Sequence, residues 1–106
     1  MARRIPQVLP EPLASNRGDL EALCRKYHVA RLAFFGSVSR GEAQPDSDLD
    51  LLVSFERGKT PGLGFFMFQE ELRDVLGQPV DLNTIEDLSR HFRDQVARDA
   101  RIVYER

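Results

Sequence analysis

Apolar residues along this 106-residue chain fall into short blocks, and their spacing predicts both strands and helices. Residues 30–35 and 49–55 are apolar runs too short for a helix, so they predict strands. The first is apolar except for Arg31, a pattern typical of a strand that is covered on both faces over most of its length. Residues 79–84 and 101–105 predict two further short strands.

Three other segments carry apolar residues three or four positions apart, as in amphipathic helices. Ser15 or Asn16 is expected to cap the first helix, residues 61–77 form the second, and Asp87 is a possible cap of the third. The apolar positions are Leu20, Leu23, Cys24 and Tyr27, then Phe65, Phe68, Leu72, Val75 and Leu76, and finally Leu88, Phe92, Val96 and Ala100.

The order of these elements predicts an α/β (α+β) fold, with a small mixed sheet of about four strands and flanking helices. The length suits one domain, which we expect at residues 15–106. Prolines at positions 6, 10 and 12 disfavour helix and predict an extended arm over residues 1–14.

Phe66 and Met67 widen the apolar stripe of the second helix beyond what a small sheet needs. Either the start of this helix is deeply buried, or it presents an apolar patch to a partner or to a second copy. The sequence leaves both interpretations open.

Composition narrows the classes of protein. Hydrophobic residues make up 42% and charged residues 30%, as in a folded soluble domain, and the net charge of −2 gives no basic surface for direct contact with nucleic acid. No apolar run is long enough to span a membrane, the N-terminus lacks the apolar core of a signal peptide, and one cysteine cannot form a disulfide framework. We therefore expect a cytoplasmic protein without membrane contacts.

Several residues of reactive types are expected to be structural or solvent-facing. Cys24 lies on an apolar stripe without a catalytic partner, so we place it in the core. His28 and His91 lack a second His or Cys at ligand spacing. Arg57 and Lys59 lie in a Gly-rich loop, where solvated charges are commoner than contacts to a triphosphate.

The candidate chemistry is concentrated between the first two strands. Asp48 and Asp50 are two residues apart where a strand begins, so their side chains share one face and repel each other unless a cation lies between them. Mg²⁺ prefers such oxygen ligands and completes its shell with water and phosphate. Gly36 lets the backbone approach a phosphate closely, and the hydroxyl of Ser37 can bind a phosphate oxygen. Arg40 adds positive charge at the same place.

Simpler explanations for this stretch fit less well. A P-loop is excluded because Glu42 and Ala43 occupy its Lys and Ser/Thr positions, and an EF-hand because Leu51 and Arg57 replace its glycine and bidentate acid. Acids that only cap a turn would leave the Gly-Ser pair and the spacing unexplained. If the strand at 79–84 pairs beside 49–55, Asp81 joins the same face, and three acids can hold two metal ions about 4 Å apart.

Together these motifs resemble a minimal nucleotidyltransferase (MNT) domain of the DNA-polymerase-beta-like superfamily. The resemblance covers about residues 18–104, and rests on Gly36-Ser37, a ten-residue gap, Asp48-Leu49-Asp50 and Asp81 downstream. It departs at Val38-Ser39, where members often carry Arg-Ala, and this affects only the detail of phosphate contact.

The resemblance implies a role for each motif residue. Asp48 and Asp50 would bind Mg²⁺, and Asp81 would be a third ligand or the general base. The substrate ATP would be held by Gly36, Ser37, Arg40 and Ser47.

The resemblance also implies an acceptor. Small MNT proteins typically accompany an all-helical HEPN protein, so the expected reaction is transfer of AMP from ATP to a hydroxyl of that partner toxin, with tyrosine the expected acceptor and this chain the antitoxin. Two alternatives stay open: an antitoxin that neutralises its partner by binding alone, and a small-molecule nucleotidyltransferase of the antibiotic-modifying type.

Overall fold

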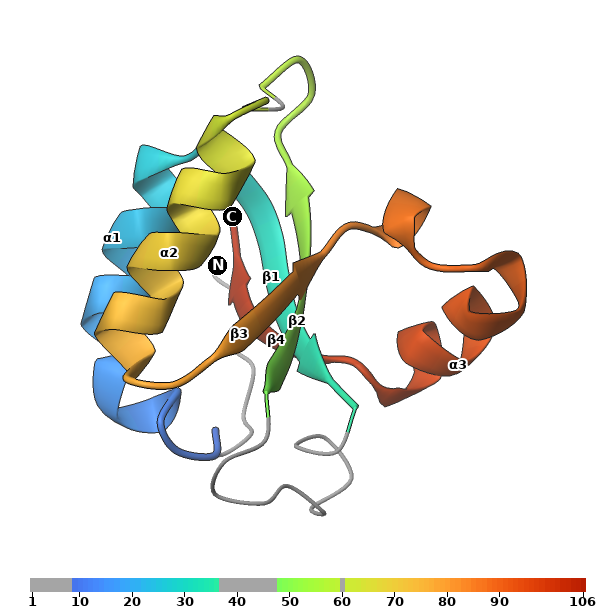
Figure 1. The fold of residues 1–106 in the computed structure, drawn as a ribbon, viewed down its shortest axis with the longest axis horizontal. Coiled ribbons are helices and arrows are strands. Elements are labelled where there is room, and N and C mark those ends of the chain that lie inside the picture. The colour runs from blue at the N-terminus through green and yellow to red at the C-terminus, as the bar shows by residue number, and fades with distance from the viewer. Residues whose placement is uncertain (1–8, 37–47, 60) are drawn as a thin grey trace.

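A computed structural model describes residues 9–36, 48–59 and 61–106 of the chain (Figure 1). Its four strands are β1 (Val29–Phe35), β2 (Leu49–Phe55), β3 (Val80–Asn83) and β4 (Arg101–Glu105). They form one sheet in the order β3-β2-β1-β4, in which β1 is antiparallel to β2 and β4 while β2 and β3 are parallel. The predicted mixed sheet of four strands is confirmed.

Helices cover both faces of this sheet (Figure 1). Helices α1 (Arg17–Lys26) and α2 (Gly64–Leu76) lie on one face, and α3 (Arg90–Asp99) lies on the other. Alternation along β2 sends Leu49, Leu51 and Val53 into the main core below α1 and α2. The intervening residues, Asp50 and Leu52 among them, therefore face the α3 side.

A smaller core joins α3 to the sheet. Phe35, Leu88 and Val96 are its buried members, and Leu52 and Ala100 pack against them. Phe92 is 45% exposed, so its prediction as a buried stripe residue is wrong. Val96 is the one buried residue of α3, because this short helix meets the sheet along a narrow line.

The packed domain begins before residue 15. Of the arm predicted over residues 1–14, residues 9–14 pack against the domain, because Leu9 and Leu13 are buried in the main core and residues 11–13 form a turn. Residues 1–8 of that arm lie outside the described residues. A 3-10 turn at Ala14–Asn16 leads directly into α1, and Leu13 is already helical. Neither Ser15 nor Asn16 caps α1 with its side chain, because the chain enters the helix from this turn.

The start of α3 also differs from the prediction. Ser89 caps α3, because its Oγ accepts a hydrogen bond of 3.3 Å from the backbone N–H of Phe92. Asp87 instead accepts a bond of 3.0 Å from the N–H of Thr84, which closes the 3-10 turn Ile85–Asp87. Asp87 is thus a cap of the preceding turn and not of α3.

The first turn of α2 presents apolar side chains to solvent. Leu63, Phe66 and Met67 are 81%, 60% and 59% exposed, whereas Phe68 is fully buried. Of the two interpretations of Phe66 and Met67, the structure supports the exposed patch. The buried stripe of the helix consists of Phe68, Leu72 and Leu76.

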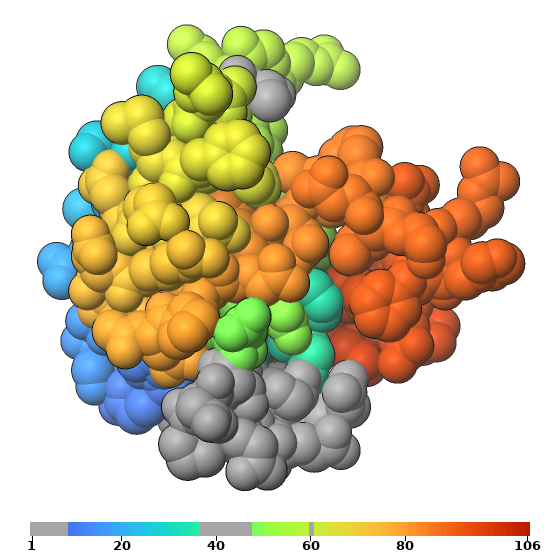
Figure 2. Space-filling model, viewed as in Figure 1, coloured from blue at the N-terminus to red at the C-terminus, as the bar shows by residue number. Residues whose placement is uncertain are grey.

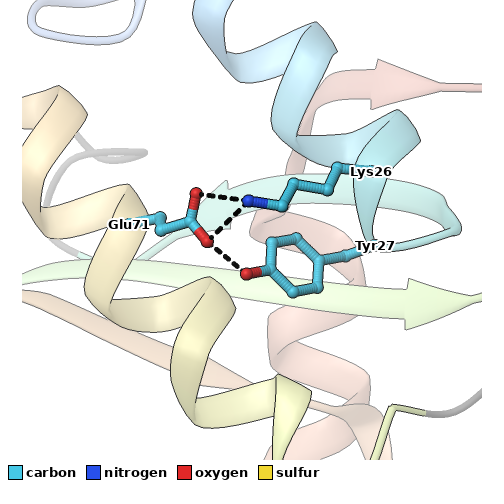
Figure 3. Close-up of polar contacts among 3 residues, drawn as sticks. All are labelled: Lys26, Tyr27 and Glu71. Carbon is cyan, nitrogen blue, oxygen red and sulfur yellow. Dashed lines mark hydrogen bonds and ion pairs between the residues drawn. The ribbon is translucent and has the colours of Figure 1, made fainter.

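A polar cluster ties the end of α1 to α2 (Figure 3). The carboxylate of Glu71 accepts hydrogen bonds from the Tyr27 hydroxyl and from Lys26 Nζ, the latter at 3.1 and 3.2 Å. The bond to Glu71 raises the pKa of Tyr27 to about 12, and the same bond lowers the pKa of Glu71. Tyr27 lies on the apolar stripe as predicted, but its hydroxyl makes a contact that periodicity does not reveal.

The residues expected to be structural behave accordingly. Cys24 is fully buried, and burial raises the pKa of its thiol to about 12, which suppresses the reactive thiolate. His28 and His91 are exposed. Across residues 9–36, 48–59 and 61–106, none of the helices has both the length and the apolar character needed to cross a membrane.

Candidate active site

Parallel pairing of β2 with β3 brings two of the predicted acids side by side. Asp50 and Asp81 are direct partners in this ladder, and neighbouring strands lie about 4.8 Å apart. Partner residues on adjacent strands project to the same face of a sheet, so both carboxylates lie on the α3 side. Asp48, two residues before Asp50, adds a third carboxylate where β2 begins.

Gly36 adjoins these acids from the other neighbouring strand. It follows Phe35, the last residue of β1, and Phe35 is the antiparallel partner of Asp50. The backbone of Gly36 has φ +75, and a Cβ built on it would lie 2.4 Å from Oδ2 of Asp50. Only a residue without a side chain leaves the Asp50 carboxylate in this position.

The acids can be reached from solvent. Asp48 and Asp81 are exposed and Asp50 is half-buried. In Figure 2 the start of β2, in green, and the end of β1, in teal, reach the surface between α3 and the side formed by α2 and β3. Two of the three acids are therefore open to solvent at this edge of the sheet.

The donor set suits a hard cation. Carboxylate oxygens are the ligands that Mg²⁺ prefers, and clustered acids need a cation to offset their repulsion. In the part of the chain that the structure describes, no three Asp, Glu, His or Cys side chains already converge as a metal-binding group. Because Asp48 and Asp81 are exposed, their carboxylates can rotate towards an ion without disturbing the core.

Three of the predicted nucleotide-binding residues belong to the segment between β1 and β2. Ser37, Arg40 and Ser47 lie outside the described residues, and so does the turn predicted after Ser37. Their roles stay predictions from the sequence.

Arg57 and Lys59 lie far from the acids. Both are exposed in the loop that follows β2, whereas the acids lie where β2 begins. The strand Leu49–Phe55 rises about 3.3 Å per residue, so roughly 20 Å separates its two ends. This separation favours the interpretation of Arg57 and Lys59 as solvated loop charges.

Two residues near Asp81 have no counterpart in the sequence analysis. Gln69 Oε1 accepts a bond of 3.0 Å from the N–H of Leu82, and Arg73 Nη2 donates one of 3.3 Å to the carbonyl of Val80. Both side chains lie on α2, four residues apart. Their role follows from how α2 docks against the edge of the sheet, and no local sequence signal indicates it.

Paired acids on adjacent strands, with a glycine against one of them, are the arrangement expected of a domain that transfers phosphoryl or nucleotidyl groups. The family model described as "Nucleotidyltransferase domain" matches residues 19–104. The chain therefore belongs to this family, and the prediction of a nucleotidyltransferase is confirmed.

Individual relatives agree with the family. The protein adenylyltransferase MntA of Thermococcus cleftensis is 39% identical over 83 residues, which cover 77% of this chain and 80% of that protein. A solved structure described as "putative minimal nucleotidyltransferase" is 42% identical, with a TM-score of 0.73, over 86% of this chain and 92% of that chain.

A more distant likeness concerns the fold alone. A solved complex, described as a tri-AMPylated HEPN toxin from Shewanella oneidensis with its MNT antitoxin, matches with 19% identity and a TM-score of 0.64. The match covers 89% of this chain and 73% of that chain.

Proposed function

We propose that this chain transfers AMP from ATP to a hydroxyl group on a HEPN-type partner toxin, and thereby acts as its antitoxin. The proposed acceptor is the hydroxyl of a tyrosine. The observation that carries the proposal is the pairing of Asp50 with Asp81 beside the backbone of Gly36. The similar protein adenylyltransferase MntA and the AMPylated toxin complex support the choice of AMP as the transferred group and of a HEPN protein as the partner.

The reaction is a single displacement at the α-phosphorus of ATP. The acceptor oxygen forms a bond to this phosphorus while the bond to the bridging oxygen of the β-phosphate breaks, so pyrophosphate leaves. The hydroxyl proton passes to Asp81 or to solvent. Asp81 suits this role because it is exposed at the edge of the site, where an acceptor arrives.

The remaining motif residues would bind the nucleotide. The backbone of Gly36 would approach the triphosphate closely, and Ser37 would contact it with its hydroxyl. From the family resemblance, Arg40 and Ser47 would contact the same group. The transferred AMP would then lie over the Asp50–Asp81 pair.

Asp48 and Asp50 would hold Mg²⁺, and Asp81 would either complete a donor set for two ions or act as the general base. Bound Mg²⁺ neutralises charge on the phosphates and lowers the pKa of the acceptor hydroxyl. Because all three acids would act on the same reacting phosphate, replacing any one of them should nearly abolish transfer of AMP.

The intact mass of the partner tests this proposal. The protein encoded beside this chain is incubated with it, Mg²⁺ and ATP, and should gain one or more AMP units. The variant Asp48→Ala/Asp50→Ala should produce no gain. A matched control, Asp19→Ala/Asp74→Ala, removes two exposed acids from α1 and α2 on the opposite face of the sheet and should transfer AMP normally.

The same experiment separates the alternatives. If the two proteins bind but no mass is gained with any of the four nucleotides, neutralisation by binding alone replaces the proposal. If the partner is unmodified and an aminoglycoside gains AMP instead, the small-molecule interpretation replaces it.

A further inference from the structure

The strand that carries Asp81 is weakly supported by the sheet itself. β3 contains four residues, Val80–Asn83, and among the described strands it lies at the edge of the sheet and pairs with β2 alone. The pairing is parallel, which is slightly less stable per residue than antiparallel pairing. Short edge strands belong to the parts of a fold that open most readily.

Side chains of helix α2 form hydrogen bonds with the outer backbone edge of β3. Gln69 accepts from the N–H of Leu82, and Arg73 donates to the carbonyl of Val80, so the peptide groups on both sides of Asp81 are held. On its inner side β3 is bound to β2, where the N–H of Leu49 donates to the carbonyl of Pro79 at 3.0 Å. The backbone around Asp81 is thus fixed from both directions.

Gln69 is the better fixed of the two side chains from α2. It is half-buried, and its oxygen accepts from a backbone N–H at the edge of β3 where none of the described strands pairs. Arg73 is more exposed, and its Nη1 also pairs with Glu70 at 2.8 Å. Loss of the Gln69 acceptor would leave the Leu82 N–H unsatisfied and free β3 to shift.

We infer that Gln69 is a positioning residue for Asp81, acting through the backbone of β3, with Arg73 as its weaker companion. The inference rests on the proposed function, in which Asp81 would be the acid nearest to the acceptor. A strand backbone sets the direction in which its side chains leave, and catalytic groups tolerate displacements of only about 0.5 Å. The bond from Gln69 to Leu82 therefore controls where the Asp81 carboxylate lies relative to the acceptor.

Three variants test the inference. Gln69→Met keeps the length of the side chain and removes the acceptor, while Gln69→Glu retains an acceptor oxygen. Gln95→Met makes the same change at an exposed glutamine of α3 and serves as the control. The measurements are amide hydrogen exchange at Leu82, and kcat and KM for ATP in transfer of AMP to the partner.

For Gln69→Met we expect exchange at Leu82 to accelerate about 10-fold and kcat to fall about 10-fold or more, as for a misplaced catalytic group. The KM for ATP should change less than about 2-fold, because Gly36 and β1 are untouched. Gln69→Glu should restore kcat to within about 3-fold of wild type, and Gln95→Met should change nothing.

Two results would overturn the inference. One is an unchanged kcat in Gln69→Met while Leu82 exchanges faster. The other is an equal loss in Gln69→Glu, since that variant keeps the acceptor. If Gln69→Met does not fold, Arg73→Met removes the other bond, and an unchanged kcat there overturns the inference as well.

Failure of the proposed function would give a different experimental result from failure of the Gln69 inference. If wild-type protein transfers no AMP, the proposed function fails, and hydrogen exchange alone decides the backbone role of Gln69. Equal exchange at Leu82 in wild type and Gln69→Met then counts against it, and faster exchange in the variant supports it.

Discussion

Replacement of Gly36 by alanine should lower activity far more than stability, because this glycine both adopts a positive φ and leaves space for the Asp50 carboxylate. Its backbone has φ +75, which L-residues with a side chain adopt at a cost of about 1–2 kcal/mol. Its missing Cβ also leaves space for Oδ2 of Asp50, which lies 2.4 Å from where that atom would be. Alanine therefore strains the backbone and also collides with the carboxylate.

The collision determines the size of the effect on activity. Normal van der Waals contact requires about 3.4 Å or more, so the Asp50 carboxylate must move by about 1 Å. A misplacement of about 1 Å can lower a rate about 100-fold. We therefore expect Gly36→Ala to reduce AMP transfer by about 100-fold, whereas strain alone should lower Tm by roughly 4–8 °C per kcal/mol.

Gly77 provides a matched control. It ends α2 with φ +71, and a Cβ there would meet nothing within 4 Å. Gly77→Ala should thus lose about the same stability and keep transfer within about 3-fold of wild type. The assay is the initial rate of AMP incorporation into the partner, with Tm measured on the same samples. Full activity in Gly36→Ala, or equal losses of activity in both variants, would show that the space left by Gly36 does not position the Asp50 carboxylate.

Two further predictions concern the core and pH. Phe68→Ala should lower the free energy of unfolding by about 3–5 kcal/mol, and Phe66→Ala by less than about 0.5, because Phe68 is fully buried and Phe66 is 60% exposed. Equal losses in urea unfolding would contradict the assigned face of α2. The pKa of Tyr27 is raised from 10.0 to about 12 by its bond to Glu71, so this bond stabilises the fold below pH 10 and the contribution disappears as pH rises towards 12. Tyr27→Phe should flatten the fall in stability over this window, and an unchanged profile would contradict the assignment.

Local patterns predict much of this fold because they report burial directly. The apolar residues before Gly36 do form a strand, which is buried on both faces over residues 32–35 although Arg31 is exposed, and the alternation after Asp48 forms its neighbour. The face shared by Asp50 and Asp81 also follows from the sequence, since it requires only that the two strands pair in parallel.

Other features depend on contacts between distant segments, which periodicity does not encode. Phe92 has helical spacing yet stays exposed, because α3 meets the sheet through Val96. Leu9 is buried despite the surrounding prolines, since the main core has room for it beside α1. Gln69 contacts β3 only because α2 docks along that edge of the sheet.

In the proposed reaction, the acids around Asp50 direct an acceptor oxygen to the α-phosphorus of ATP. The most direct test supplies ATP that carries radioactive phosphorus at either the α or the γ position, with wild-type protein and with Asp50→Asn. We predict that the partner retains label only from the α position, that label from the γ position leaves as pyrophosphate, and that Asp50→Asn transfers neither. Label from the γ position on the partner would show phosphoryl transfer instead, and undiminished labelling by Asp50→Asn would contradict the assigned site.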